Sequence, residues 1–165
     1  MQGLAAFFLW AILGVAVGWA GAVAKAALLA NDPGWAGTFY IVTCAIWIGG
    51  LFLGSILIAR GFQACGIWFT RTLTTWCGVL TVLLCGLSDL SFDYLLWRKT
   101  QPANTPPTLT AWWQQYSTKD VISYSRRHGA TTLPQGVQFA LQLGVAALIV
   151  VSGCSGLGYD PEDDR

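Results

Sequence analysis

Four long apolar segments constrain this chain more than any other feature of its sequence. They cover residues 4–29, 35–59, 68–97 and 135–152. A helix needs about 17 to 25 mostly apolar residues to cross the hydrocarbon core of a bilayer. Segments of this length cross as helices, because lipid offers no hydrogen-bond partner to the backbone. The sequence therefore predicts an all-α membrane protein with a four-span transmembrane helix bundle.

The composition supports this class. Of the 165 residues, 55% are hydrophobic and 10% are charged, whereas soluble domains have about 25% charged residues. The formal net charge of +1 argues against an electrostatic nucleic-acid surface. We therefore expect partners among lipids and other membrane-protein subunits, with no nucleic-acid partner, and we identify no soluble substrate.

Short connections predict the topology. The turn signal at 31–34 and the short segment at 60–71 join the first three spans, so neighbouring spans must run antiparallel, up-down-up-down. The apolar run near the N-terminus is too long for a signal-peptide core and has no basic residue before it. We therefore expect the first span to be retained. An acidic tail follows the last span at residues 160–165.

The loop at 98–134 is the only sizeable polar region. Trp112, Trp113 and Tyr116 recur in it at helical spacing, which predicts a short amphipathic helix at about residues 108–127 with an interfacial aromatic face. Two interpretations stay open. The helix lies flat on the membrane surface, or its aromatic side chains cap the ends of the spans or pack on a neighbouring subunit.

Basic residues indicate the orientation. The side of the long loop carries Arg98, Lys99, Lys119, Arg126 and Arg127, and basic loops stay on the cytosolic or matrix side. We therefore expect the loop on that side and both termini on the opposite side. The mitochondrial inner membrane is the expected location, because the complexes of energy-transducing membranes contain many small multi-span subunits.

Polar residues within the spans form a predicted cluster. The topology places Lys25, Asp89, Asp93, Gln138 and Gln142 at similar depth near the loop side. Charges inside a span are expected to face the bundle and to pair. The cluster is either a structural ion pair, in which Lys25 neutralises one aspartate, or part of a proton or ion pathway. The structural interpretation is favoured because these charges lie close to a span end.

Glycines mark the predicted packing faces. Gly14, Gly18 and Gly21 share one face of the first span, and Gly50 and Gly54 share one face of the second. Small residues four apart let another helix approach closely. Where no helix fills such a face, the furrow suits a lipid chain. Structural lipids aside, we expect no cofactor.

Catalytic chemistry has no visible basis in the sequence. The single histidine, His128, lies in the loop, and the five cysteines show no metal-type spacing. We interpret the cysteines as small apolar helix residues. We expect no catalytic residue, no metal ligand and no enzymatic activity.

Four spans with a long last loop resemble the tetraspan outline. That loop contains no cysteine, so the tetraspanin Cys-Cys-Gly signature is missing, and the first loop is too short for a claudin signature. The function we expect is a small accessory or structural subunit of a larger membrane complex, for example of a respiratory chain. The alternatives are a small ion or proton transporter or channel protomer that uses Lys25, Asp89 and Asp93, and a membrane organiser similar to MARVEL proteins.

Overall fold

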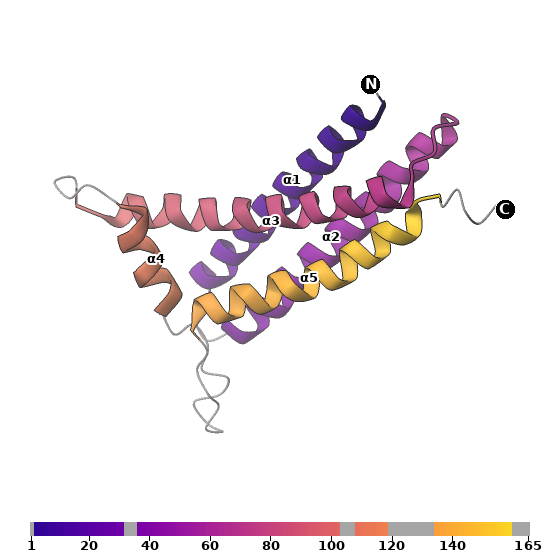
Figure 1. The fold of residues 1–165 in the computed structure, drawn as a ribbon. Helices are drawn as coiled ribbons and strands as arrows, with labels where there is room; N and C mark the ends of the chain where they lie inside the picture. Colours follow the sequence, from indigo (N-terminus) through magenta and orange to yellow (C-terminus); the bar gives the residue numbers. More distant parts are fainter. Residues whose placement is uncertain (1, 32–35, 103–107, 119–133, 160–165) are drawn as a thin grey trace.

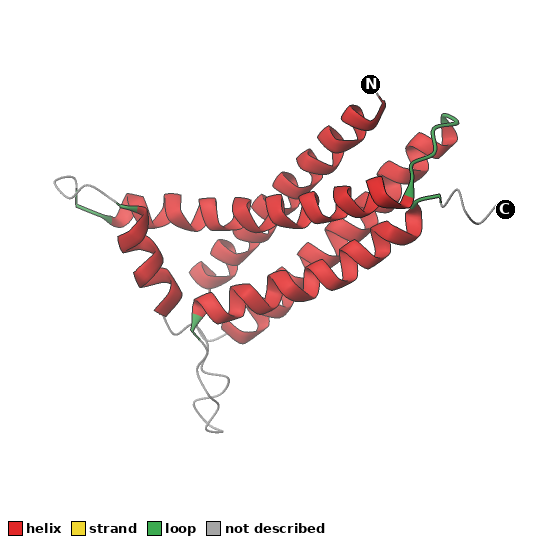
Figure 2. Ribbon diagram, viewed as in Figure 1, coloured by secondary structure: helices red, strands yellow, loops and turns green. Residues whose placement is uncertain are grey.

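The described residues form four long helices and one short helix. The structure is a computed structural model, and it describes residues 2–31, 36–102, 108–118 and 134–159. The helices are α1 (Gln2–Asn31), α2 (Ala36–Ala64), α3 (Arg71–Thr100), α4 (Leu109–Thr118) and α5 (Gln135–Leu157) (Figures 1 and 2). All four long helices are apolar and long enough to cross a membrane. The chain is thus the all-α, multi-pass membrane protein that the sequence predicts, with a short helix between spans 3 and 4.

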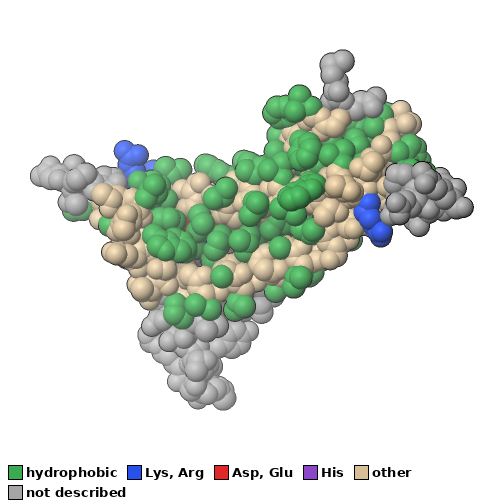
Figure 3. All heavy atoms as spheres, in the orientation of Figure 1, with side chains coloured by type: hydrophobic (Ala, Val, Ile, Leu, Met, Phe, Trp, Pro, Cys, Tyr) green, Lys and Arg blue, Asp and Glu red, His purple; other side chains and the backbone are tan. Residues whose placement is uncertain are grey.

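The four long helices surround a common core. α1 packs against α2 and α3, and α5 packs against the same two helices, so α2 and α3 face each other across the bundle. Apolar side chains fill its centre: Trp47, Leu51, Val82, Cys85, Ala146, Val150 and Cys154. Many large apolar side chains face outward instead, as expected for lipid contact, and Figure 3 shows them spread over one face with basic side chains near its two ends.

Glycines set the close contact between α1 and α3. A Cβ atom at Gly14 would lie 2.5 Å from the carbonyl oxygen of Thr81, and one at Gly18 would overlap the carbonyl oxygen of Cys85. Only glycine lets two backbones meet at this distance. These two glycines of the predicted face therefore contact the third span, which runs parallel to the first.

The other predicted glycines lie between α1 and α2. A Cβ atom at Gly21 would lie 2.7 Å from Nε1 of Trp47, one at Gly50 would lie 3.1 Å from the methyl groups of Val17, and one at Gly54 would overlap Leu13. The glycine faces of the two helices therefore belong to two separate contacts, one with α3 and one between α1 and α2.

The second helix extends beyond its predicted end at residue 59. It continues to Ala64, where the amide of Gly66 donates to the carbonyl of Gln63 (2.9 Å) and that of Ile67 to the carbonyl of Phe62 (3.0 Å). Gly66 has a φ of 75°, so these bonds form a Schellman motif. The predicted boundary was wrong because this glycine, and not Arg60, ends the helix.

The third helix starts later than its predicted start at residue 68. The side chain of Thr70 caps it by accepting a hydrogen bond from the amide of Leu73, so Arg71 is its first residue. The chain before it pairs with the end of α5: the amide of Tyr159 donates to the carbonyl of Phe69 (2.8 Å), and that of Arg71 to the carbonyl of Tyr159 (3.0 Å). This pairing joins the start of α3 to the end of α5.

The boundaries of the last two helices also differ from prediction. α5 runs to Leu157 rather than 152, because Gly153 does not stop the helix: a Cβ atom there would overlap the ring of Phe52. α4 starts as predicted and is helical to Thr118. The rest of the predicted helix, residues 119–127, and the tail at 160–165 lie outside the described residues. Figure 1 shows α4 turning back from the end of α3 toward the start of α5.

Candidate functional site

A buried triad of charges joins α1 to α3 at the end of the bundle next to α4. Nζ of Lys25 lies 3.1 Å from both carboxylate oxygens of Asp89, and it also donates a hydrogen bond to Oδ2 of Asp93. The side chains are 9%, 4% and 12% exposed for Lys25, Asp89 and Asp93. The pairing that the sequence predicts is therefore present, but Lys25 binds both aspartates and not one.

The glycine contact between α1 and α3 explains this register. Lys25 follows Gly18 by two helical turns, and Asp89 follows Cys85, the residue that Gly18 touches, by one turn. Residues four apart lie on one face of a helix, so Asp93 falls one turn further along α3. The close backbone contact at Gly18 therefore places the ammonium group of Lys25 between the carboxylates of Asp89 and Asp93.

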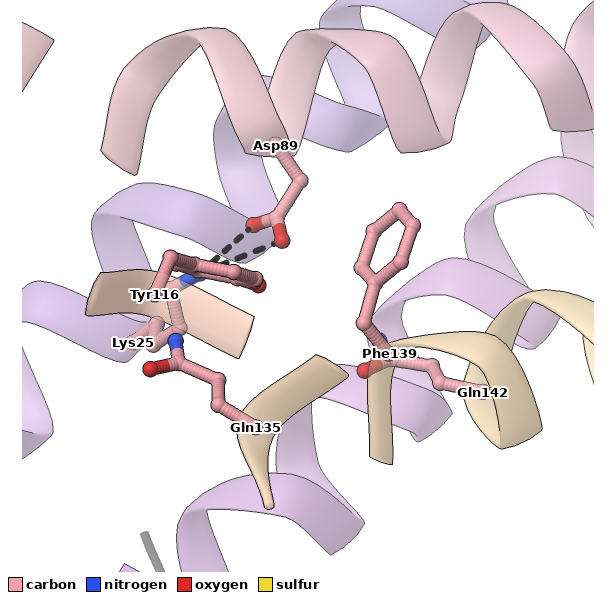
Figure 4. Close-up of a pocket in the computed structure, with 6 residues that line it drawn as sticks. All are labelled: Lys25, Asp89, Tyr116, Gln135, Phe139 and Gln142. Carbon is pink, nitrogen blue, oxygen red and sulfur yellow. Dashed lines mark hydrogen bonds and ion pairs between the residues drawn. The ribbon is translucent and has the colours of Figure 1, made fainter. Parts of the chain in front are cut away.

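The triad borders a small polar cavity. It measures about 10 Å³ and is lined by Lys25, Asp89, Tyr116, Gln135, Phe139 and Gln142 (Figure 4). A cavity of this size holds one water molecule. Figure 4 shows Gln142 reaching from α5 toward the space between Asp89 and Tyr116. Gln142 is 7% exposed, and its Nε2 atom has no hydrogen-bond partner among the described residues.

Of the predicted polar cluster, Lys25 of α1 pairs with Asp89 and Asp93 of α3, and Gln142 of α5 lines the same cavity as Lys25 and Asp89. Gln138 is buried like Gln142, but it does not line the cavity. Tyr116 does line it, although the sequence predicts only an interfacial role for this residue. Gln135 and Phe139 are lining residues that the predicted cluster lacks. The spacing of Gln135, Gln138 and Gln142 places the three glutamines on one helical face, and this is a sequence signal that could have identified Gln135.

The aromatic face of α4 covers this end of the bundle. Trp112 and Tyr116 are buried, and Trp112 packs edge-on against Tyr94 of α3 at 5.5 Å between ring centroids. Nε1 of Trp97 donates a hydrogen bond to Oε1 of Gln115 (2.6 Å). Trp113 is 45% exposed. Of the two interpretations left open by the sequence, capping of the span ends holds for Trp112 and Tyr116.

The hydroxyl groups of Thr74 and Thr81 in α3 lie between the triad and the opposite end of the bundle, and both bond to backbone carbonyls. Thr81 donates to the carbonyls of Cys77 (2.7 Å) and Trp10 (3.2 Å), and Thr74 donates to the carbonyl of Arg71 (3.0 Å). Each bond goes to the backbone and none of them leads toward Asp89. The apolar core therefore separates the triad from the opposite end of the bundle, where α2 ends and α3 begins.

A second feature is an apolar groove on the outer side of α3 and α5. It has a volume of about 330 Å³ and is lined by Val79, Val82, Leu83, Ala140, Leu143, Gly144, Ala147 and Val151. A Cβ atom at Gly144 would meet no atom within 4 Å. Ala140 and Gly144 are four residues apart, and so form an unfilled small-residue pair on α5.

The site therefore combines a buried polar cluster with an open apolar groove. The described residues contain no group of three or more His, Cys, Asp or Glu side chains that could hold a metal ion. Comparison of the chain with protein-family models, with curated proteins and with solved structures finds no match.

Proposed function

We propose that this chain is a non-catalytic structural subunit of a larger membrane assembly, and that the groove beside Gly144 receives a transmembrane helix of another subunit. The observation that carries the proposal is the unfilled groove itself. Helices in lipid gain no hydrophobic free energy from meeting each other, so they associate where small residues allow close van der Waals packing.

Close packing at small residues also forms the contacts within this bundle. Gly14 and Gly18 contact α3, Gly54 contacts Leu13, and a Cβ atom at Gly86 would lie 2.9 Å from Leu143. Gly144 presents a similar surface with nothing against it. A partner helix fits the groove because its lining is apolar throughout and α5 exposes its backbone at Gly144.

The apolar core next to the polar cluster favours a structural role over the transporter alternative. A conduction path needs polar groups through the whole membrane, and here the hydroxyls of Thr74 and Thr81 bond to nearby carbonyls. The triad then acts as a clamp that holds α1 to α3. We propose an energy-transducing membrane, the mitochondrial inner membrane first, with the loop at 98–134 on the matrix side.

The test compares two glycine substitutions in the native membrane. Gly144→Leu fills the groove, and Gly49→Leu is the matched control, since a Cβ atom at Gly49 also meets no atom within 4 Å and Gly49 does not line the groove. Each variant is solubilised in mild detergent and separated by native electrophoresis, and the co-migrating chains are identified by mass spectrometry.

We expect the wild type and Gly49→Leu to migrate with the same partner chain, and Gly144→Leu to lose it. A photo-crosslinking residue at 144 should label that chain, whereas one at the exposed Leu57 of α2, which does not line the groove, should not. Migration of the wild type alone or as a homo-oligomer contradicts the proposal and favours the transporter.

A further inference from the structure

The polar cavity beside the triad has a hydrogen-bond acceptor on one wall and a donor on another. On the α3 side, a carboxylate such as that of Asp89 has about four acceptor sites, and Lys25 occupies two of them. On the α5 side, Gln142 is 7% exposed, and its Nε2 atom has no partner among the described residues. Both side chains line the cavity, and Gln142 reaches toward it (Figure 4).

The ammonium group of Lys25 does not connect these two walls. An ammonium group has three N–H donors, and those of Lys25 go to Oδ1 and Oδ2 of Asp89 and to Oδ2 of Asp93. The described hydrogen bonds of the Lys25 and Asp89 side chains therefore run between α1 and α3, and none of them reaches α5. A buried N–H group without a partner, such as that of Gln142, is unfavourable, so a molecule that bridges the gap is favoured.

We propose that this cavity is a binding site for one water molecule, which joins Gln142 of α5 to Asp89 of α3. The water accepts a hydrogen bond from Nε2 of Gln142 and donates one to a carboxylate oxygen of Asp89. Buried waters make about three hydrogen bonds, and the amide group of Gln135, which lines the same cavity, offers a third. The ion pair thus holds α1 to α3 directly, and the water connects α5 to that pair.

The lining of the cavity selects a small neutral molecule. A cation would lie against the ammonium group of Lys25 and the N–H groups of Gln142, and an anion would lie against the carboxylate of Asp89. Water both donates and accepts, and the volume of about 10 Å³ matches a single water molecule. The site does not depend on the proposed structural role, since no residue that lines the apolar groove borders it.

Nuclear magnetic resonance of the full chain in detergent micelles tests the proposal. The protein is deuterated at carbon and carries ¹⁵N in its glutamine and tryptophan side chains, and Gln142→Met assigns the Gln142 signal by removing it. A water held in the cavity should give cross peaks to the Nε2 protons of opposite sign in NOE and ROE spectra, whereas hydrogen exchange gives one sign in both. Trp47 is the matched control, because its Nε1 atom is buried without a described partner but does not line the cavity. We expect no such cross peak at Trp47.

A relayed signal from the Tyr116 hydroxyl, which borders the cavity, is excluded with Tyr116→Phe, in which we expect the Gln142 cross peak to persist. A crystal structure grown from a lipid mesophase should show one water about 3 Å from both Nε2 of Gln142 and a carboxylate oxygen of Asp89. Four results would overturn the proposal: no cross peak at Gln142, equal cross peaks at Gln142 and Trp47, loss of the peak in Tyr116→Phe, or a direct bond from Gln142 to Asp89 with no density between them. The wild-type spectra and the crystal structure decide the matter even if a variant fails to fold.

Discussion

Lys25 and Asp89 are 64 residues apart in the sequence, yet the ammonium group of one lies 3.1 Å from both carboxylate oxygens of the other. Their helices run parallel and are not consecutive, so no local turn brings the residues together. The backbone contact of Gly14 with Thr81 and of Gly18 with Cys85 sets the distance and the register of the two helices, and the ion pair joins them at the far end. Packing and charge therefore hold α1 and α3 at two separate points.

Removal of Lys25 should destabilise the bundle strongly. Lys25→Met removes the ammonium group that both Asp89 and Asp93 bind, and the loss of one partner of a buried pair lowers the free energy of unfolding by about 3 to 5 kcal/mol. Asp89→Asn should have a clearly smaller effect, because Lys25 keeps its bond to Asp93. Unfolding followed by circular dichroism in detergent measures both. Equal losses in the two variants would contradict a shared triad.

Two alanine substitutions at glycine should act in opposite directions. Gly18→Ala places a methyl group against the carbonyl oxygen of Cys85, and such overpacking lowers the free energy of unfolding by about 1 to 3 kcal/mol. Gly49→Ala meets no atom within 4 Å, so the higher helix propensity of alanine should raise stability by about 0.5 to 1 kcal/mol. The same unfolding measurement applies. A loss of stability in both variants would show that glycine flexibility, and not close packing, matters at position 18.

The fold could be predicted because membrane spans follow from length and hydropathy alone. The meeting of Lys25 with Asp89 could also be predicted, since the topology puts their positions at one end of the bundle. The ends of the helices were harder to predict from the sequence. Gly153 has the sequence signature of a helix end, but its role depends on packing against the ring of Phe52, which belongs to another span. No pattern within α5 contains that information.

The cavity could not be predicted because it needs α4. Periodicity identifies Trp112, Trp113 and Tyr116 as one aromatic face, but it does not say whether that face meets lipid or protein. The answer depends on where α4 lies, and Figure 1 shows it turned back from the end of α3 toward the start of α5. Tyr116 then lines the polar cavity, a position that follows from three-dimensional packing and not from its spacing in the sequence.

Loss of the buried tryptophan should release α4 while the long helices stay folded. Trp112 packs between Tyr94 and Tyr116, and replacing a buried tryptophan with alanine lowers stability by about 3 to 5 kcal/mol. Since α4 contacts only α3 and α5 among the described helices, the loss should be confined to its own docking. Every 1.4 kcal/mol is a factor of ten in an equilibrium constant, so amide hydrogen exchange in α4 should accelerate by about a hundredfold or more in Trp112→Ala.

Trp113→Ala is the matched control, because that side chain is 45% exposed and its removal should change exchange little. Equal acceleration in both variants, or acceleration that spreads into α1, would contradict the docking of α4 through Trp112.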